Sequence, residues 1–283
     1  MTLKLDQVTL VCFDTRNIEA AIFSMSMSLK KTKFAESILF TNKSICSKEL
    51  TSKAKIAGIH LEDVPEISSI SEYSFFILSN LSSYINTEFC LVTQWDSWII
   101  DHKLWDSQFL NYDYIGAIWP HYSTNQVGNG GFSLRSKKLL KSTEDFIKNN
   151  LDFSTPLIED DYICRQHKGI FEQKYNIKFS SSEVANKFSI ERNGMPNNSF
   201  GFHGMYNFCF VLKKDNELLA LINKLCDECY LARDSYDLAK FLLKDKRFSV
   251  AKLIIRKRFK VIGLSTKNIK LLFFLLLRLI KIN

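Results

Sequence analysis

Carboxylates that follow apolar runs are the residues of this sequence best suited to chemistry. Residues 89–100 read FCLVTQWDSWII, an apolar run that meets Gln94, Trp95 and Asp96 and then turns apolar again. An ionised carboxylate in apolar surroundings is costly unless a cation, backbone N–H groups or a metal ion pairs with it. A divalent cation takes oxygen ligands, and a bound diphosphate supplies several of them. Asp96 is therefore a candidate metal ligand, and a helix-capping role is the alternative.

A second group of acids follows downstream. Glu159, Asp160 and Asp161 stand in a row within residues 156–165, which read as the start of a helix. Acids in a first helical turn are stabilised by the helix dipole, which is one interpretation of this group. The functional interpretation is a general base, because an ionised carboxylate accepts the proton of an attacking hydroxyl. The residues alone leave both interpretations open.

Glycines and a histidine complete the candidate residues. Residues 128–131 read GNGG, and glycine permits a turn or the close approach of a ligand to the main chain. His203 stands between two residues of an aromatic stretch, FGFHGMYN, where it is either a core histidine or a metal ligand. As a ligand, it would complete a site begun by Asp96.

Apolar runs and helical periodicity predict the elements that must position these side chains. Strands are expected at residues 7–13, 37–41, 56–61 and 89–96, and helices at residues 18–29 and 71–85, the last with Phe75 facing inward. Strand–helix–strand alternation predicts parallel strands joined by crossover helices. Ligands of such sheets bind at the carboxyl ends of the strands, where Asp14 and Asp96 stand.

The stretch that follows is less regular. Residues 113–119 and 127–135 read as strands, the second entered through the glycine-rich bend, and residues 137–149 read as a helix. Residues 200–207 read as an aromatic loop, so we expect His203 on a loop.

The composition is that of a soluble globular protein, with 46% hydrophobic and 24% charged residues among 283. The net charge of +8 is concentrated at one end, because residues 249–283 hold nine Lys or Arg and no acid. A nucleic-acid-binding domain normally carries its positive charge over a folded face. The pI of about 9.0 therefore does not favour a nucleic-acid partner.

The C-terminal residues predict an amphipathic helix. Lys267, Lys270, Arg278 and Lys281 recur at helical spacing and leave an apolar face made of Leu271, Leu272, Leu275, Leu276, Leu279 and Ile282. The apolar run at residues 271–277 is far shorter than the ~20 residues that span a bilayer. A basic face opposite an apolar one is typical of a helix at a membrane surface. The alternative is a helix packed on the protein with its basic face in water.

Cysteine usage indicates a reducing compartment. The seven Cys are scattered and odd in number, and the N-terminal residues give no signal-peptide pattern, so we expect reduced thiols in a cytoplasmic protein. Cys226 and Cys229 form a lone CxxC, for which a helix with two half-buried thiols is favoured over a metal site.

These motifs in this order resemble a known family. VTLVCFDTRN, TQWDSWI, DYIGAIW, VGNGGFSLRS, EDDY, FSIERN and FGFHG resemble the DUF5672-like family of bacterial glycosyltransferases of the GT-A type, from about residue 7 to residue 208. The resemblance implies an α/β fold of the GT-A-like, Rossmann-related kind. This is a mixed, mainly parallel sheet flanked by helices, here with a basic C-terminal helical extension. We expect a catalytic domain at residues 1–210 and a helical extension at 211–283, with the basic amphipathic tail from about residue 249.

The resemblance also implies roles for individual residues. Asp96 would bind a divalent metal, Mn²⁺ or Mg²⁺, with His203 as the late metal ligand, and Gln94 would bind the donor. Asp14 and Thr15 would face the nucleotide, and Gly130 and Gly131 would line the sugar pocket. Asp160 would be the base of an inverting enzyme beside Glu159, and Asp161 would be the base if the register differs by one. The first acid of a D-x-D motif is replaced here by Gln94.

The function so implied is transfer of a sugar from a nucleotide-diphosphate-sugar donor, UDP-linked, to a glycan acceptor. The acceptor would be a cell-surface glycan of lipopolysaccharide or capsule type, and the reaction would be metal-assisted and inverting. The enzyme would be a hexosyltransferase-like protein of the cytoplasm, peripheral to the inner face of the cell membrane through its tail, with no nucleic-acid partner. The alternative is a catalytically silent, membrane-peripheral module that binds sugar nucleotides or serves as a scaffold.

Overall fold

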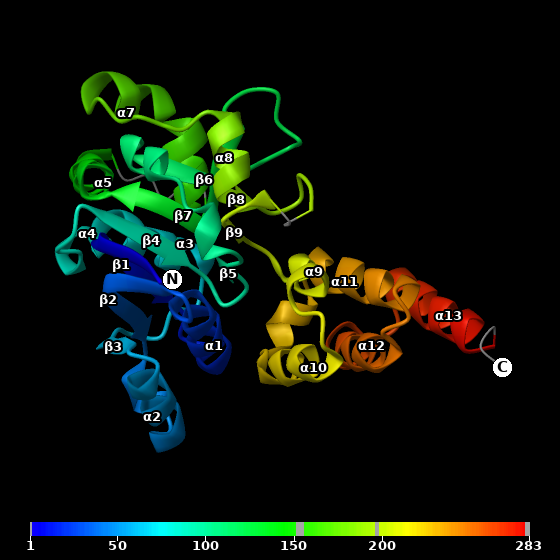
Figure 1. Cartoon of the computed structure of the whole chain (residues 1–283). Helices are drawn as coiled ribbons and strands as arrows, with labels where there is room; N and C mark the ends of the chain where they lie inside the picture. Colours follow the sequence, from blue (N-terminus) through cyan, green and yellow to red (C-terminus); the bar gives the residue numbers. More distant parts are fainter. Residues whose placement is uncertain (1, 151–155, 196–197, 281–283) are drawn as a thin grey trace. The chain divides into compact units, whose positions relative to one another are not determined.

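The computed structural model describes residues 2–150, 156–195 and 198–280 (Figure 1). The chain forms two units, residues 1–203 and residues 204–283. The boundary expected from the sequence, between residues 210 and 211, lies slightly further along the chain.

The first unit is built on a six-stranded sheet in the order β3-β2-β1-β4-β7-β6. Its strands are β1 (Leu3–Phe13), β2 (Thr32–Thr41), β3 (His60–Asp63), β4 (Phe89–Thr93), β6 (Tyr114–Ile118) and β7 (Val127–Ser136). The pairs β1–β2, β1–β4 and β2–β3 are parallel, as the alternating pattern predicts. The pairs β4–β7 and β6–β7 are antiparallel. The predicted fold class, a mixed and mainly parallel sheet flanked by helices, is confirmed.

Helices cover both faces of the sheet. Successive side chains of β1 point to opposite faces, so each face has its own buried cluster. Leu10 and Cys12 belong to one buried cluster, which also contains Ile22 of α1 (Ile18–Leu29). Val11 and Phe13 belong to a second, opposite cluster. That cluster is completed by α3 (Ile70–Ser79), α4 (Leu81–Tyr84) and one face of α5 (Lys137–Asn150). The first cluster also receives side chains of α2 (Lys48–Ile56), α7 (Lys168–Lys174) and α8 (Ser182–Phe188).

Three details differ from the sequence-based expectations. The strand expected at residues 56–61 begins later, because residues 48–56 form α2, which Ser47 caps by accepting a hydrogen bond from Leu50 N. The helix expected at residues 71–85 is divided at Asn80 into α3 and α4. Phe75 does not face inward: it is among the exposed large hydrophobic residues.

The first unit also contains a second, three-stranded sheet. It contains β5 (Trp98–Ile99), β8 (Ser189–Ile190) and β9 (Gly201–Phe202) in the order β5-β9-β8. The remaining short elements in the described part of this unit are 3₁₀ turns and α6, which leads into a turn of π-helix. They are η1 (Lys43–Ile45), η2 (His102–Leu104), η3 (Ser107–Asn111), α6 (Glu159–Asp161) and η4 (Tyr162–Gln166).

The described part of the second unit is helical throughout. Its elements are η6 (Met205–Asn207), α9 (Phe208–Val211), α10 (Asp215–Lys224), η7 (Asp227–Tyr230), α11 (Arg233–Lys244), α12 (Phe248–Ile262) and α13 (Thr266–Ile280). Of the two CxxC cysteines, Cys226 directly precedes η7 and Cys229 lies within it. Their sulfurs are 3.7 Å apart, and both residues are half-buried. Within the residues that the structure describes, we find no helix with the length and apolar character needed to cross a membrane.

Candidate active site

Asp96 and His203, distant in sequence, meet at the carboxyl end of β4. His203 Nε2 lies 3.5 Å from Asp96 Oδ1. They are brought together because β5 begins two residues after Asp96 and pairs antiparallel with β9, which ends immediately before His203. Trp98 is fixed in this pairing by edge-to-face contact with Phe202. The carboxylate between two tryptophans thus has an imidazole as its neighbour.

His203 lies between two carboxylates. Its Nδ1 lies 3.4 Å from Glu191 Oε1, on the other side of the ring from Asp96. Burial by itself would lower the pKa of His203, but the charges of Asp96 and Glu191 and hydrogen bonds to them outweigh burial and raise it well above its usual value. Without a cation between them, the two acids therefore favour an imidazolium here.

Gln94 connects this cluster to α3. Its Oε1 lies 3.1 Å from His203 Nε2, and its Nε2 donates to the hydroxyl of Tyr73 at 3.4 Å. The turn that carries Gln94 and Asp96 is held in place from two sides. Ser24 of α1 donates to the carbonyl of Gln94 at 2.8 Å, and Ser97 Oγ donates to the carbonyl of Gly131 at 2.7 Å.

The glycines of β7 make room for side chains of the protein itself. A Cβ on Gly131 would overlap the imidazole of His203, and a Cβ on Gly130 would overlap the carboxylate of Glu159. The expected lining of a sugar pocket by these glycines remains a prediction. What the structure adds is that both positions require glycine for the cluster to assemble.

Glu159 is engaged in a buried ion pair. Arg135 Nη2 donates to its Oε1 at 2.9 Å, and the two side chains are 0% and 4% exposed. Arg135 also donates from Nε to Ser133 Oγ and lies over the ring of Tyr114. In the described residues, Arg135 Nη1 and Glu159 Oε2 have no hydrogen-bond partner. Such a pair is costly to break from one side.

Asp160 is held differently from its two acidic neighbours. Its Oδ2 accepts the N–H of Gly130 at 2.9 Å, beside the cluster of His203 and Gly131. Burial and then the charge of Glu159 raise the pKa of Asp160 to about 7, against the effect of the Gly130 N–H. Asp161 instead turns to Arg165, 3.3 Å away, and to the side-chain amide of Gln166. Of the three acids, Asp160 has the properties of a proton acceptor near neutral pH.

Asp14 and Thr15 line a pocket of about 240 Å³ at the carboxyl end of β1. Asp14 Oδ1 accepts the N–H groups of Arg16 and Asn17, and Thr15 Oγ1 accepts that of Ile67 at 3.2 Å. Burial raises the pKa of Asp14 to about 6 in spite of these N–H groups, and the charge of Asp96 adds to the rise. Tyr73, the partner of Gln94, also lines this pocket.

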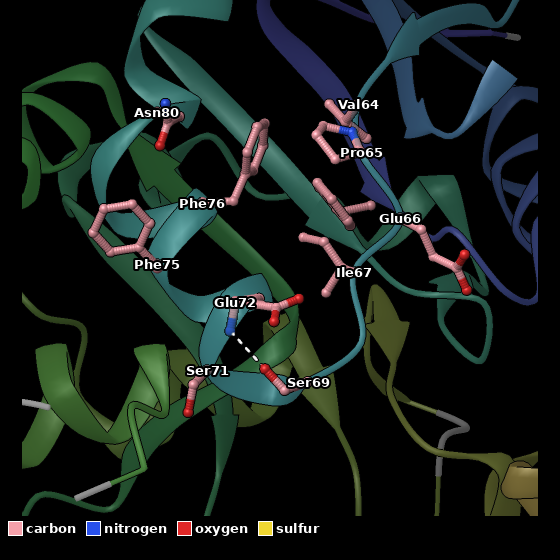
Figure 2. Close-up of a pocket in the computed structure, with 11 residues that line it drawn as sticks. Val64, Pro65, Glu66, Ile67, Ser69, Ser71, Glu72, Phe75, Phe76 and Asn80 are labelled. Atoms are coloured by element: carbon pink, nitrogen blue, oxygen red, sulfur yellow. Dashed lines mark hydrogen bonds between the residues drawn. The ribbon is translucent and has the colours of Figure 1, made fainter. Parts of the chain in front are cut away.

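A larger apolar pocket of about 620 Å³ adjoins the Asp14 pocket and shares Phe13, Ile67 and Ser69 with it. Figure 2 shows its two walls, Phe75 and Phe76 of α3 on one side and the loop from Val64 to Ile67 on the other. Ser69 and Glu72 fix the start of α3, because Ser69 Oγ accepts the N–H of Glu72 at 3.2 Å.

Asp96 and His203 supply a carboxylate oxygen and an imidazole nitrogen that are close enough to share one cation. No set of three or more His, Cys, Asp or Glu side chains in the described ranges is arranged to hold a metal ion. The two residues therefore fit a site that needs oxygens of a bound diphosphate and water to complete its shell. Their role as metal ligands remains a prediction.

The predicted site residues form three neighbouring groups. Gln94, Asp96, Gly131 and His203 form one cluster, and Gly130, Glu159 and Asp160 form a second one beside it on β7. Asp14 and Thr15 lie in the pocket at the end of β1.

Sequence reasoning missed three further members of these groups. Arg135 ends the VGNGGFSLR motif on an otherwise uncharged strand, which was a signal that it has a buried partner. Glu191 stands in the FSIERN motif but carries no mark of its contact with His203. Tyr73 lies on a helix whose periodicity says only that it is half-buried.

The geometry is that of an α/β protein whose polar cluster lies where parallel strands end. The chain belongs to the family described as a protein of unknown function (DUF5672), whose family model matches residues 55–203, more than half of the chain. That range contains Gln94, Asp96, both glycines, the three consecutive acids and His203.

Solved structures of low similarity include two glycosyltransferases. A glycosyltransferase involved in the glycosylation of the major capsid of PBCV-1 has 10% identity and a TM-score of 0.43, over 69% of this chain and 91% of that chain. The apo-form of the glycosyltransferase GlyE from Streptococcus pneumoniae TIGR4 has 12% identity and a TM-score of 0.43, over 70% of this chain and 54% of GlyE. The match thus spans about half of GlyE. At these TM-scores the likenesses do not establish an activity. No curated protein matches the chain significantly.

Proposed function

We propose that the protein is a hexosyltransferase-like glycosyltransferase that moves a sugar from a UDP-linked donor to a hydroxyl of a glycan. The observation that carries the proposal is the position of Asp160. Its carboxylate, with a pKa of about 7, accepts the N–H of Gly130. The next residue, Gly131, lies against the imidazole of His203, which is the neighbour of Asp96. A proton acceptor and a candidate diphosphate site thus occur side by side. The acceptor class, a cell-surface glycan of lipopolysaccharide or capsule type, follows from the sequence resemblance.

The donor nucleoside is proposed to occupy the pocket at the end of β1. Asp14 accepts its two backbone N–H groups on Oδ1, which leaves Oδ2 on the same carboxylate to accept a hydroxyl of the ribose. The adjoining apolar pocket, with Phe75 and Phe76 on its wall, suits a planar base. The diphosphate would then extend past Tyr73 toward Gln94 and Asp96.

The reaction we propose is a direct displacement with inversion. The oxygen of the acceptor hydroxyl forms a bond to the anomeric carbon while the bond from that carbon to the diphosphate oxygen breaks. The electron pair leaves with the nucleoside diphosphate, and the hydroxyl proton passes to the carboxylate of Asp160. General-base assistance of this kind contributes about 10²–10⁴-fold. Positioning of donor and acceptor supplies much of the remainder.

A divalent cation, Mn²⁺ or Mg²⁺, is proposed to be held by Asp96 and His203. When bound, it would neutralise charge that develops on the departing diphosphate. For a nitrogen of His203 to serve as a ligand it must be unprotonated, so the cation would replace a proton that the two flanking acids otherwise favour.

The test is release of nucleoside diphosphate from a panel of nucleotide-sugar donors with glycan acceptors, with and without Mn²⁺ or Mg²⁺. Metal-dependent release that requires an acceptor and disappears in Asp160→Asn supports a transferase. The alternative is a catalytically silent module that binds sugar nucleotides. Donor-induced thermal stabilisation with no release for any donor, acceptor and metal combination would favour that alternative.

A further inference from the structure

Helix α13 has three distinct faces. Its buried face contains Asn268, Leu271 and Leu275. A second face is apolar and exposed, and we call it the stripe. Its residues recur at helical spacing and are 39–59% exposed: Ile269, Leu272, Phe273, Leu276 and Leu277. The basic edge consists of the exposed residues Lys267, Lys270 and Arg278, and it also contains Phe274, which is 41% exposed. The apolar face expected from the sequence is thus divided. Leu271 and Leu275 pack inward while Leu272 and Leu276 face solvent, and the side chains of Leu279 and Ile282 lie outside the described residues.

The orientation of α13 is fixed by a buried polar contact within the second unit. Arg258 of α12 donates from Nε to Asn268 Oδ1 at 3.0 Å, and Asn268 Nδ2 donates to the carbonyl of Gly263 at 2.9 Å. Arg258 Nη1 also donates to the carbonyl of Tyr230 at 2.8 Å. Rotating α13 to bury the stripe would leave these groups unsatisfied, which is costly. The stripe is therefore an outward face of a packed helix.

The charged residues of α12 and α13 are all basic, because no acidic residue occurs after Asp245. Arg258 is buried and Lys260 is paired with Asp227. The others are exposed or half-buried: Lys252, Arg256, Lys257, Lys267, Lys270 and Arg278. Two copies of this chain that met along the stripe would bring their basic edges together. An anionic surface gains from the same charges, and an apolar stripe beside cations is the pattern of a helix that lies in a bilayer interface.

We propose that the α13 stripe is a docking surface for an anionic phospholipid bilayer. Leu272, Phe273 and Leu276 enter the boundary of the acyl chains, while Lys267, Lys270 and Arg278 reach the headgroups. Helix α13 has 15 residues, so it lies along the surface and does not span the bilayer. This inference uses only residues of the second unit and is independent of sugar transfer.

The test is co-sedimentation of the full-length protein with vesicles of phosphatidylcholine alone or mixed with phosphatidylglycerol. Binding is expected to the mixed vesicles only, and to weaken at high salt. The stripe variant, Leu272→Gln with Phe273→Gln and Leu276→Gln, should lose this binding. The edge variant, Lys267→Gln with Lys270→Gln and Arg278→Gln, should bind the mixed vesicles with about 10²-fold lower affinity, because each charge contributes roughly fivefold.

Matched controls come from exposed residues of the first unit. Ile45→Gln with Ile56→Gln and Ile170→Gln removes as much exposed apolar character, and Lys30→Gln with Lys31→Gln and Lys33→Gln removes as much charge. Both controls should bind like the unaltered protein, and circular dichroism should show all variants folded. Equal binding to both kinds of vesicle, no binding to either, or unchanged binding by the stripe variant would each overturn the proposal. A dimer in light scattering that the stripe variant abolishes, with no vesicle binding, would assign the stripe to self-association instead.

Discussion

His203 Nε2 lies 3.5 Å from Asp96 Oδ1, although the two residues are far apart within the DUF5672 match, which ends at residue 203. Their meeting depends on a short pairing, β5 with β9, and on Gly131, which leaves space for the imidazole. If Asp96 and His203 share a cation, the residues that bring them together are as necessary as the ligands themselves.

We expect His203→Ala to weaken metal dependence and Asp96→Ala to abolish transfer while the fold is retained. Loss of a group that only supports a metal ligand typically weakens metal affinity about 10–100-fold. Loss of His203 should raise the Mn²⁺ concentration for half-maximal activity by at least as much. His60→Ala is the matched control, because His60 is exposed and contacts only Glu62 among its described ion pairs. An unchanged Mn²⁺ titration for His203→Ala would make His203 a structural residue. Turnover of Asp96→Ala close to that of the unaltered protein would exclude a central role for the carboxylate.

Asp160→Asn should lower kcat by about 10²–10⁴-fold and leave donor affinity nearly unchanged, because a base acts in the transition state. Single-turnover transfer and donor titration by calorimetry measure the two quantities. Asp161→Asn is the control, since Asp161 is turned toward Arg165 and Gln166. If Asp161→Asn is the inactive variant, the base is displaced by one residue. If both variants are active, base-assisted inversion is the wrong mechanism.

The raised pKa of Asp160 gives a pH dependence. The carboxylate must be ionised to accept a proton, so kcat/KM should rise tenfold per pH unit below about 7 and level off above it. The contribution of Asp160 to the stability of the fold changes with pH in the opposite direction. The folded protein holds the proton of Asp160 more tightly than the unfolded chain, so stability is full below the usual Asp pKa and is lost as pH rises through about 7.

Asp160→Asn should therefore melt at the same temperature as the unaltered protein at pH 4 and at a higher one at pH 8. Differential scanning fluorimetry across this range measures the gap, with Asp161→Asn as the reference. A variant that is less stable at pH 8 than at pH 4, relative to the unaltered protein, would show that the Gly130 N–H outweighs burial at Asp160.

Gly131→Ala should reduce activity as strongly as loss of His203, because the added Cβ would occupy the place of the imidazole. Gly169→Ala is the control, since a Cβ there meets nothing within 4 Å. Metal titration of both variants separates a displaced histidine from general destabilisation. Normal activity of Gly131→Ala would mean that the position of His203 is not needed for the reaction.

The parallel half of the sheet could be predicted because its strands and crossover helices are marked by local apolar periodicity, as at residues 7–13 and 18–29. The meeting of Asp96 and His203 was anticipated from motif order. The reason for Gly131 was not, because the imidazole it accommodates is more than seventy residues away and nothing local marks the contact. The antiparallel direction of β7 and the half-buried Tyr73 likewise depend on tertiary packing.

Glu159→Gln should destabilise the fold, because it leaves the buried guanidinium of Arg135 without a compensating charge. One-sided loss of a buried pair typically costs about 3–5 kcal/mol in the free energy of unfolding. Asp161→Asn breaks an ion pair that is partly exposed, so it should cost less than about 1 kcal/mol. Urea unfolding of both variants provides the comparison. Replacing both partners, Arg135→Met with Glu159→Leu, should cost less than the sum of the two single changes. If Glu159→Gln keeps full stability and loses turnover alone, Glu159 acts in the chemistry, and the ion pair with Arg135 is not what holds α6 against β7.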